Sequence, residues 1–382
     1  MPGARPAGGV TLHREWVADQ LQVTGSGERL NALLVGGSEP ADLAGTLAAA
    51  LRLNVPAVVA APLTNPFTIA LATLGFAPLD GDPAAVAVEV ALMDGPRPRE
   101  LVEGFSLANA LRAGLSVGAG PELLVHLAAI AREAEVLGFP QIIRVLAPEI
   151  PEVTVPGCPF EGYGPAGLLG YLIDTLYDAP TVTGRLKENL PPMPLEERVA
   201  ESADTGPRLV FVRGRASGVE VVCRTEGTST EVSGTCRFYA SEETAVRAVE
   251  SGVVGEGDLI VVGGCGPRGG PGLLRLDRLE DAVREVGVQI PVLTDGLAPH
   301  SATGTWASLA TPEAATGGAV WYLRDGDRLR LDLGEGLIRT GVGADELGSR
   351  EPFSVPVTTG SGYAARYSRA ALPALEGAGF DL

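Results

Sequence analysis

The sequence predicts an α/β protein with a parallel-sheet N-terminal part and a strand-rich C-terminal part. Near the N-terminus, apolar runs of strand type alternate with helical segments. After residue 208, a series of apolar or alternating runs follows. With 382 residues, the chain is long enough for about two domains, each with its own core.

The first half of the chain begins with a helix, expected over residues 13–24. RLNALLVGGSEP (29–40) is typical of a buried strand that ends in a Gly-rich turn, and NVPAVVAAP (54–62) of a second buried strand. The helical segment 41–53 joins them into a βαβ unit, which predicts a parallel sheet. Further helices are expected over 65–76, over 106–139 with an interruption at Gly118–Pro121, and over 164–178.

The second half contains mainly strand patterns. RLVFVRG, GVEVVCRTE, STEVSGTCRFYA, DLIVVGG and IPVLTDG are apolar or alternating, and two amphipathic helices are expected over 241–252 and 277–287. The segment 319–333 has a hairpin pattern, with its turn around Asp325-Gly326.

A Pro-rich and charged stretch separates the two halves. We therefore expect an α/β domain in residues 1–190, a linker in 191–208 and a β-rich domain in 209–382. The cleft between the two domains is where we expect a site.

Charge and composition exclude several classes of partner. The formal net charge is −18, so the surface repels phosphate backbones and anionic lipid, and neither nucleic acid nor a membrane is expected as a partner. The N-terminus lacks the apolar core of a signal peptide, and no apolar run approaches the length of a membrane span. These features predict a cytoplasmic protein.

The four cysteines do not form a metal or disulfide pattern. They lack CxxC spacing, three histidines do not complete a zinc-type cluster, and four cysteines are few for a disulfide framework in a chain of this length. These residues are Cys158, Cys223, Cys236 and Cys265.

One Gly-rich stretch stands out. GDLIVVGGCGPRGGPGLL (257–274) passes from a strand into a bare turn, and Cys265 stands at its entrance. Together with TVTGRLKENL (181–190), HLAAIAREA (126–134) and the tail GYAARYSRAALPALEGAGF (362–380), it resembles the dihydroxy-acid dehydratase/phosphogluconate dehydratase family. The matching segments run in order from about residue 13 to 380. The resemblance implies that the C-terminal domain is a β-barrel.

The departures from that family concern its inorganic centre. The resemblance implies an iron–sulfur cluster beside Mg²⁺, with one cluster cysteine upstream of the matched part. A second cysteine, a magnesium-ligand aspartate and a modified lysine correspond to Glu39, Pro40 and Ala41. The segment with the third cysteine is missing between Val58 and Asn65. Cys265 stands where the family has a magnesium-binding glutamate, so we expect no metal and no cofactor.

The family's catalytic serine follows a Thr-Asp-Gly turn, and Pro299 takes its place here. His300 and Ser301 come next. An imidazole titrates near neutral pH, so His300 is a candidate general base; a role for Ser301 beside it is weaker, because adjacency in sequence does not create a Ser–His hydrogen bond.

Other side chains are candidates with ordinary structural explanations beside them. Cys265 could be a nucleophile or a small core residue, Glu39 an acid/base at a strand end, and Asp295 a pocket residue or a turn former. Arg268 could bind an anion or brace its own loop. The expected substrate-binding set is Arg268, Gly269, Gly270 and Thr183.

Three readings of function remain open at this stage. The first is a metal-free enzyme, a lyase, isomerase or cyclase, that acts on a small oxygenated metabolite in a specialised biosynthetic pathway. The second is a non-catalytic subunit that pairs with an intact dehydratase. The third, a true iron–sulfur dehydratase with misaligned ligands, is disfavoured by the positions of the cysteines. The family resemblance implies a homodimer, and a heteromer with an intact relative is the alternative.

Overall fold

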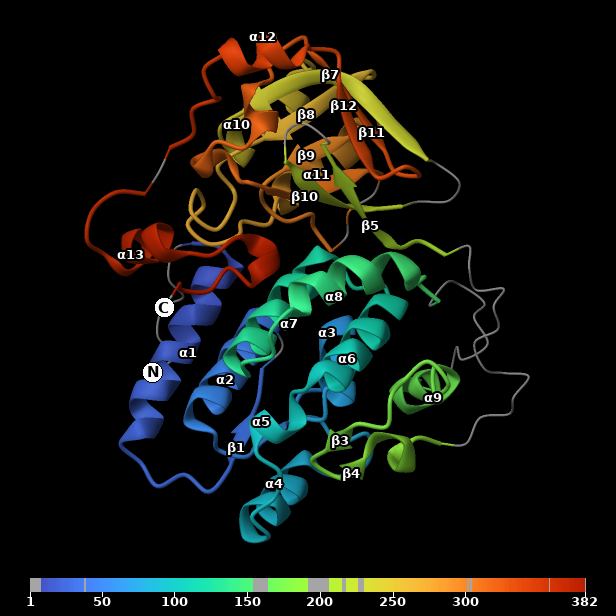
Figure 1. The fold of residues 1–382 in the computed structure, drawn as a ribbon, viewed down its shortest axis with the longest axis vertical. Coiled ribbons are helices and arrows are strands. Elements are labelled where there is room, and N and C mark those ends of the chain that lie inside the picture. Colours follow the sequence, from blue (N-terminus) through green and yellow to red (C-terminus); the bar gives the residue numbers. More distant parts are fainter. Residues whose placement is uncertain are drawn as a thin grey trace. The chain divides into compact units, whose positions relative to one another are not determined.

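The computed structural model describes residues 8–37, 39–153, 164–191, 206–214, 218–225, 230–300, 302, 304–356 and 358–381. The chain divides into two compact units (Figure 1). The barrel unit consists of Met1–Leu12 and Leu209–Leu382, and the helical unit of His13–Arg208. The predicted α/β fold class is confirmed.

The helical unit contains the predicted βαβ unit. Strand β1 (Leu33–Val35) and strand β2 (Ala57–Val59) pair in parallel, and helix α2 (Pro40–Leu53) connects them. The first strand is shorter and more exposed than expected, since Leu34 points to solvent. Alanines dominate the buried face of α2, which lets neighbouring helices pack closely.

Helices make up most of the remainder of this unit; those within 65–76 and 106–139 were predicted, whereas the helices at 83–92, 98–101 and 139–146 were not. The helix predicted over 164–178 ends early, at Tyr171. The bounds are α1 Val10–Ser26, which begins in the barrel unit, α3 Pro66–Thr73, α4 Pro83–Leu92, α5 Pro98–Leu101, α6 Gly104–Ser116, α7 Pro121–Glu133, α8 Phe139–Leu146 and α9 Gly164–Tyr171; the short strands β3 Pro180–Thr181 and β4 Gly184–Arg185 follow.

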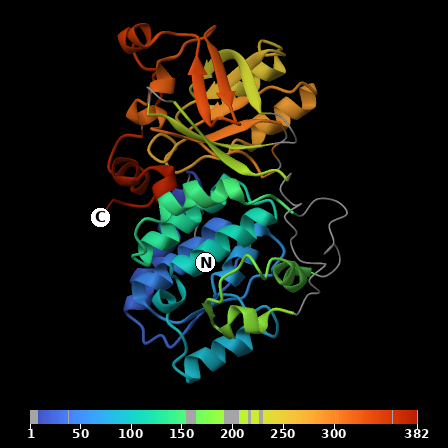
Figure 2. The same ribbon diagram turned by 45° about the vertical axis from the view of Figure 1, so that its right-hand side comes forward.

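The barrel unit closes on itself. Eight strands in its described part form a barrel in the order β10-β6-β5-β12-β11-β7-β8-β9 (Figure 2). Closure leaves no open sheet edge and confirms the barrel that the family resemblance implied. The bounds are β5 Leu209–Arg213, β6 Glu220–Arg224, β7 Glu231–Tyr239, β8 Asp258–Val262, β9 Val292–Thr294, β10 Trp306–Thr311, β11 Arg328–Asp332 and β12 Leu337–Thr340.

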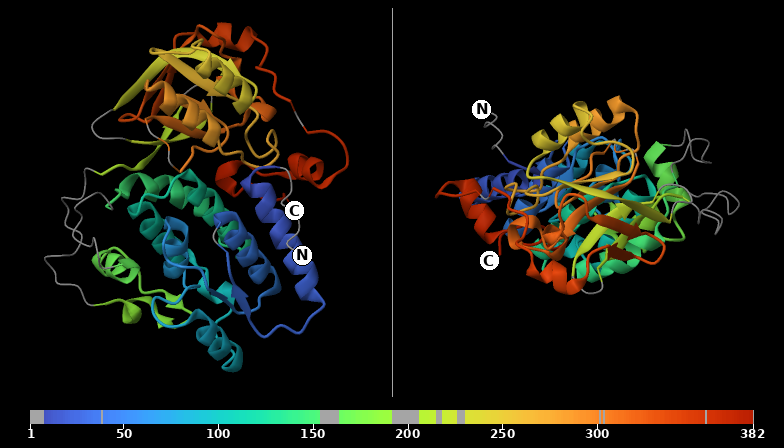
Figure 3. Two further views of the ribbon diagram at one scale, coloured as in Figure 1. Left: turned by 180° about the vertical axis from the view of Figure 1, so that it is seen from behind. Right: turned by 90° about the horizontal axis from the view of Figure 1, so that it is seen from above.

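Helices α10 (Glu242–Glu250) and α11 (Asp277–Val286) lie side by side over the parallel strands β7, β8 and β9 (Figure 3). The strand β8 is apolar on both faces for this reason. Leu259 and Val261 belong to the core inside the barrel, whereas Ile260 and Val262 pack in the cluster that contains residues of α10 and α11. Parallel strands covered on both faces need such a continuous apolar run.

The predicted hairpin over 319–333 is wrong in its first arm. Ala319–Tyr322 forms a 3₁₀ helix, and β11 instead pairs with β12 downstream and with β7. Trp321 explains the difference, because its ring is fully buried and its Nε1 donates a hydrogen bond to the carbonyl oxygen of Pro312 at 3.0 Å. Tertiary burial of this ring overrides the local strand pattern.

The barrel unit takes in a short segment from the start of the chain. The amide of Gly9 donates to the carbonyl of Pro271, and the amide of Val10 donates to that of Leu273, both at 2.9 Å. The Thr11 hydroxyl lies 2.7 Å from the phenol of Tyr367 in helix α13 (Tyr363–Ala370). Residues from both parts of the chain therefore build this unit.

In the described part of the chain, no helix combines the length and the apolar character needed to cross a bilayer.

Candidate functional site

The Gly-rich turn begins where β8 ends, and the side chain of Asp295, the residue after β9, binds its backbone. The Asp295 carboxylate accepts hydrogen bonds from the amides of Cys265 at 2.8 Å, Ala314 at 3.0 Å and Gly264 at 3.1 Å. Three separate segments of the chain thus meet on one carboxylate. The side chain expected to point into a pocket forms this junction in the barrel unit.

Burial raises the pKa of Asp295 to about 6, and the three amide hydrogen bonds oppose that rise. The side chain is almost inaccessible to solvent. A buried carboxylate whose oxygens already accept three amides is out of reach of a substrate, so this geometry favours the turn-forming role.

A second carboxylate, Glu313, holds the far side of the same turn. Its oxygens accept the amide of Arg268 at 3.0 and 3.1 Å and the amide of Gly269 at 3.0 Å. Burial first, and then the negative charge of Asp295, raise the pKa of Glu313 to about 7. Sequence analysis missed this residue; the only local signal is its place after Thr311-Pro312, where β10 ends.

The bare backbone of the turn is explained by its close approach to other parts of the chain. A Cβ on Gly270 would lie 2.0 Å from the carbonyl oxygen of Gly272. Gly272 itself has a φ of +76°, and a Cβ there would lie 2.8 Å from Leu12. Glycine is required at both positions because no side chain fits and the second needs a left-handed backbone.

Cys265, at the entrance of the turn, is 1% exposed and belongs to the apolar cluster that also contains Val246 and Leu279 of the two covering helices. Burial, and then the charges of Asp295 and Glu242, raise the pKa of its thiol well above 9. Nucleophilic cysteines need the opposite shift. The surroundings therefore favour the role of a small core residue.

Arg268 is half-buried, and its Nε donates a hydrogen bond to the carbonyl oxygen of Ala371 at 2.9 Å. This contact agrees with the second alternative given for Arg268, in which the side chain braces its own loop. Gly269 and Gly270, the neighbouring substrate-binding candidates, offer only backbone, and the Gly269 amide already bonds to Glu313.

His300 lies on the surface of the barrel unit, five residues after Asp295. Its imidazole is accessible to solvent, as a general base requires. Ser301 falls outside the described residues, so a contact between the two is not assigned.

The remaining two candidates belong to the helical unit. Glu39 is exposed and precedes α2, with no hydrogen bond from its side chain to the start of that helix. Thr183 is exposed in the turn between β3 and β4. Its hydroxyl lies 3.2 Å from that of Thr181 and accepts a hydrogen bond from Asn189 at 3.2 Å.

The donor atoms present do not fit the magnesium site that the resemblance assigns. Mg²⁺ requires several oxygen ligands, whereas Pro40 and Ala41 supply no side-chain donor and Cys265 supplies a thiol that faces an apolar cluster. Within the described ranges, no three His, Cys, Asp or Glu side chains converge as a metal-binding group. Cys158 lies outside those ranges.

Comparison with known proteins gives consistent matches. The family model described as "Dihydroxy-acid/6-phosphogluconate dehydratase C-terminal" matches residues 198–378. Dihydroxy-acid dehydratase of Methanoregula boonei is 32% identical over 298 residues, which cover 71% of this chain and 53% of that protein. That of Acidothermus cellulolyticus is 32% identical over 334 residues, 80% of this chain and 58% of that protein.

Dihydroxy-acid dehydratase of Mycobacterium ulcerans is 30% identical over 321 residues, 78% of this chain and 55% of that protein. The chain thus spans a little over half the length of the curated relatives it matches. The matched residues cover both the helical and the barrel unit, in agreement with the ordered series of motifs. The chain belongs to the dihydroxy-acid/6-phosphogluconate dehydratase family.

Proposed function

We propose that this chain is an acid/base enzyme, a lyase, isomerase or cyclase, that acts on a small oxygenated metabolite without a metal cluster. The main support is that the Gly-rich turn of the family is retained, while the donors at the matched metal positions are unsuited to Mg²⁺. If the protein keeps the framework of the family without a metal ion as Lewis acid, its side chains must catalyse the reaction by proton transfer.

In this proposal His300 is the general acid/base. It is exposed and follows a segment that Asp295 anchors, so its loop starts from a rigid point. Glu39 is the second candidate. A positioned acid or base contributes about 10²–10⁴-fold to a rate, which is sufficient for an acidified C–H or a conjugated leaving group but not for loss of an unactivated hydroxyl.

Deuterium exchange tests the proposal without knowledge of the product. The purified protein is incubated in D₂O with a panel of small oxo and hydroxy acids, and wash-in next to the carbonyl or carboxyl group is followed by NMR. We expect enzyme-dependent exchange that falls by about 10²-fold in His300→Ala and is unchanged in Glu285→Gln, an exposed control on α11. Full exchange by His300→Ala refutes the assigned role of His300.

Metal content provides the complementary test. We expect anaerobically purified protein to turn over without stoichiometric iron and in the presence of a chelator. Bound iron with sulfide absorption, lost together with activity, would overturn the metal-free mechanism.

The burial of Cys265 and the saturated hydrogen bonding of Asp295 favour a second candidate function, a non-catalytic partner of an intact dehydratase. In that case the chain co-purifies with its relative and changes the relative's stability or turnover, and His300→Ala has no effect. A homodimer in the cytoplasm, active alone, is the arrangement that we propose for the enzyme; isolation of only the mixed complex would favour the partner role.

A further inference from the structure

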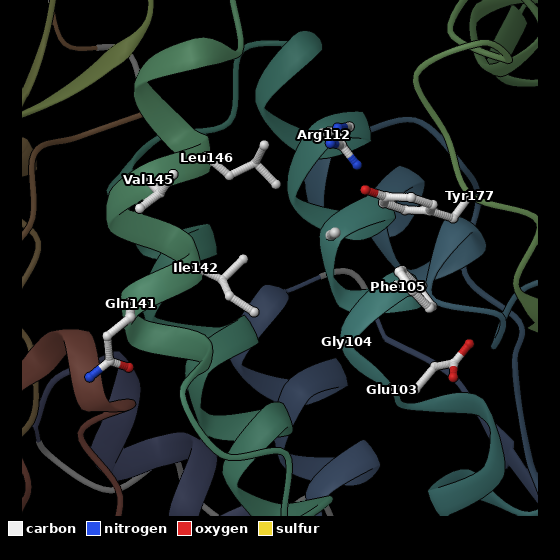
Figure 4. A pocket seen from close by; sticks show the side chains of 10 residues that line it. Glu103, Gly104, Phe105, Arg112, Gln141, Ile142, Val145, Leu146 and Tyr177 are labelled. Atoms are coloured by element: carbon white, nitrogen blue, oxygen red, sulfur yellow. The ribbon is translucent and has the colours of Figure 1, made fainter.

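A hollow of about 590 Å³ lies in the helical unit between α6 and α8 (Figure 4). Its residues recur at helical spacing on one face of each helix, and Tyr177 lines it from a third segment. The lining consists of Glu103, Gly104, Phe105, Ala108 and Arg112 from α6 and the residue before it, Gln141, Ile142, Val145 and Leu146 from α8, and Tyr177.

Large apolar side chains line this hollow although they are open to solvent. Phe105 is 55% exposed and Val145 68%, and Ile142 lies beside them (Figure 4). Exposed apolar side chains are ordinary when they are scattered, but a set gathered around one concave space is characteristic of a ligand site.

Arg112 supplies the positive charge of the hollow. Its guanidinium carbon lies 5.1 Å from the centroid of the Tyr177 ring, which holds the side chain by a cation–π contact. Its Nη1 is shielded from water and has no hydrogen-bond partner in the described structure. A shielded guanidinium nitrogen without an acceptor is unfavourable, and a carboxylate is the acceptor that best matches the guanidinium fork.

The charges also define the orientation of a ligand. Glu103 and Arg112 lie at opposite ends of the α6 side of the hollow (Figure 4). Their positions are nine residue steps apart, or about 13.5 Å at 1.5 Å per residue. One negative group is therefore attracted at the Arg112 end and repelled at the Glu103 end, while Phe105 and Ile142 contact an apolar body between them.

We infer that this hollow binds a small monocarboxylate with an aryl or branched aliphatic body, with the carboxylate on Arg112. Because Nη1 is shielded in this structure, binding requires the guanidinium to turn toward the carboxylate, which then accepts hydrogen bonds from the Arg112 fork. This site uses none of the residues assigned to proton transfer, so it goes beyond the proposed function and does not depend on it.

The test measures binding of phenylacetate, 3-phenylpropanoate and 4-methylpentanoate to the full chain by calorimetry or ligand-observed NMR, with neutral phenylacetamide as the isostere. At least one acid should bind at concentrations up to about 10 mM, the range expected for ligands of this size. Phenylacetamide should bind at least about tenfold more weakly than phenylacetate. Equal binding of these two, or no binding of any acid, overturns the inference.

Variants locate the binding. Arg112→Met should weaken the acid by about tenfold or more, because one charged hydrogen-bonding group is lost. The melting temperature of this variant should change little, since Nη1 has no hydrogen-bond partner to lose and only the cation–π contact with Tyr177 is removed. The control Arg97→Met removes an exposed arginine of the same unit that pairs with Asp94, and it should leave binding unchanged.

Two outcomes contradict the assignment through these variants. Unchanged acid binding by Arg112→Met places the ligand elsewhere. A dimer that Val145→Glu dissociates, combined with failure of every acid to bind, assigns the hollow to a second copy of the chain.

Discussion

Glu313 makes the stability of the barrel unit depend on pH. Its folded-state pKa of about 7 lies above the ordinary value near 4.5, so the folded protein binds a proton more readily than the unfolded chain over the interval between them. The contribution of this group to stability is therefore present at low pH and is lost as pH rises through 7. Asp295, with a pKa raised to about 6, acts in the same direction over a lower interval.

We expect the free energy of unfolding to fall by about 2 kcal/mol between pH 5.5 and 7.5 through Glu313 alone. Urea titrations of wild type and of Glu313→Gln at several pH values measure this. Glu313→Gln should lose most of that pH dependence, even if it is less stable throughout. An identical slope in both proteins would show that Glu313 is not the titrating group.

Gly270 carries the steric requirement of the Gly-rich turn. A methyl group at this position would lie 2.0 Å from the Gly272 carbonyl oxygen, so Gly270→Ala should destabilise the barrel unit by about 3 kcal/mol. Gly255→Ala is the matched control, because a Cβ there meets nothing within 4 Å, and its stability should change by less than about 0.5 kcal/mol. Equal unfolding midpoints for the two variants would contradict the close packing of the turn.

At the scale of secondary-structure elements, one arginine connects three helices of the helical unit. Arg52 on α2 donates to both carboxylate oxygens of Glu133 on α7, at 2.6 and 3.0 Å. It also donates to Asp19 at 2.9 Å and to Glu15 at 3.1 Å, both on α1. The guanidinium is largely buried, so these contacts are weakly screened by solvent.

Arg52→Met should therefore destabilise the helical unit by about 3 kcal/mol, because it leaves partly buried carboxylates without their cation. Chemical denaturation followed by far-ultraviolet circular dichroism measures the loss. Arg97→Met, which removes a surface pair with Asp94 and a hydrogen bond to the Asn54 carbonyl oxygen, should cost no more than about 1 kcal/mol. An unchanged free energy of unfolding in Arg52→Met would mean that water solvates the carboxylates as well as the arginine does.

Helices and strands were predicted correctly where the spacing of apolar residues alone determines which faces are buried. The helix α2 and the strand β8 follow directly from apolar spacing, and β8 shows why, since both of its faces are buried. The segment 319–322 was mistaken for a strand because its pattern does not show that Trp321 is drawn into the core. Closure of the barrel came from the family resemblance, as strand patterns do not specify long-range pairing.

The candidate site was less predictable, because it depends on contacts between distant segments. The sequence indicated a turn that needs glycine, but not that Gly270 meets its own chain or that Asp295 and Glu313 hold the turn. A single glutamate after a proline looks like an ordinary loop residue. For Cys265 the sequence left open a nucleophile or a small core residue, and its apolar surroundings are visible only when α10 and α11 are placed.

At the scale of the whole molecule, each unit has its own core, and the three tryptophans are distributed between them. Trp16 belongs to the helical unit, and Trp306 and Trp321 to the barrel unit. In single-tryptophan variants, Gly270→Ala should shift the urea transition reported by Trp306 and leave that reported by Trp16 in place. Arg52→Met should do the reverse. A common shift of both transitions would show that the two units unfold as one cooperative body.

The pairing of residues 9–11 with residues 271–273 and Tyr367 has a consequence for synthesis on the ribosome. Residues 9–11 leave the ribosome before the helical unit, and their partners follow only after it. The segment must therefore stay uncommitted while the whole helical unit and much of the barrel unit are translated. Deletion of residues 9–11, or of helix α13 with Tyr367, should lower the yield of folded protein far more than the distance of these segments from the barrel strands in the sequence suggests.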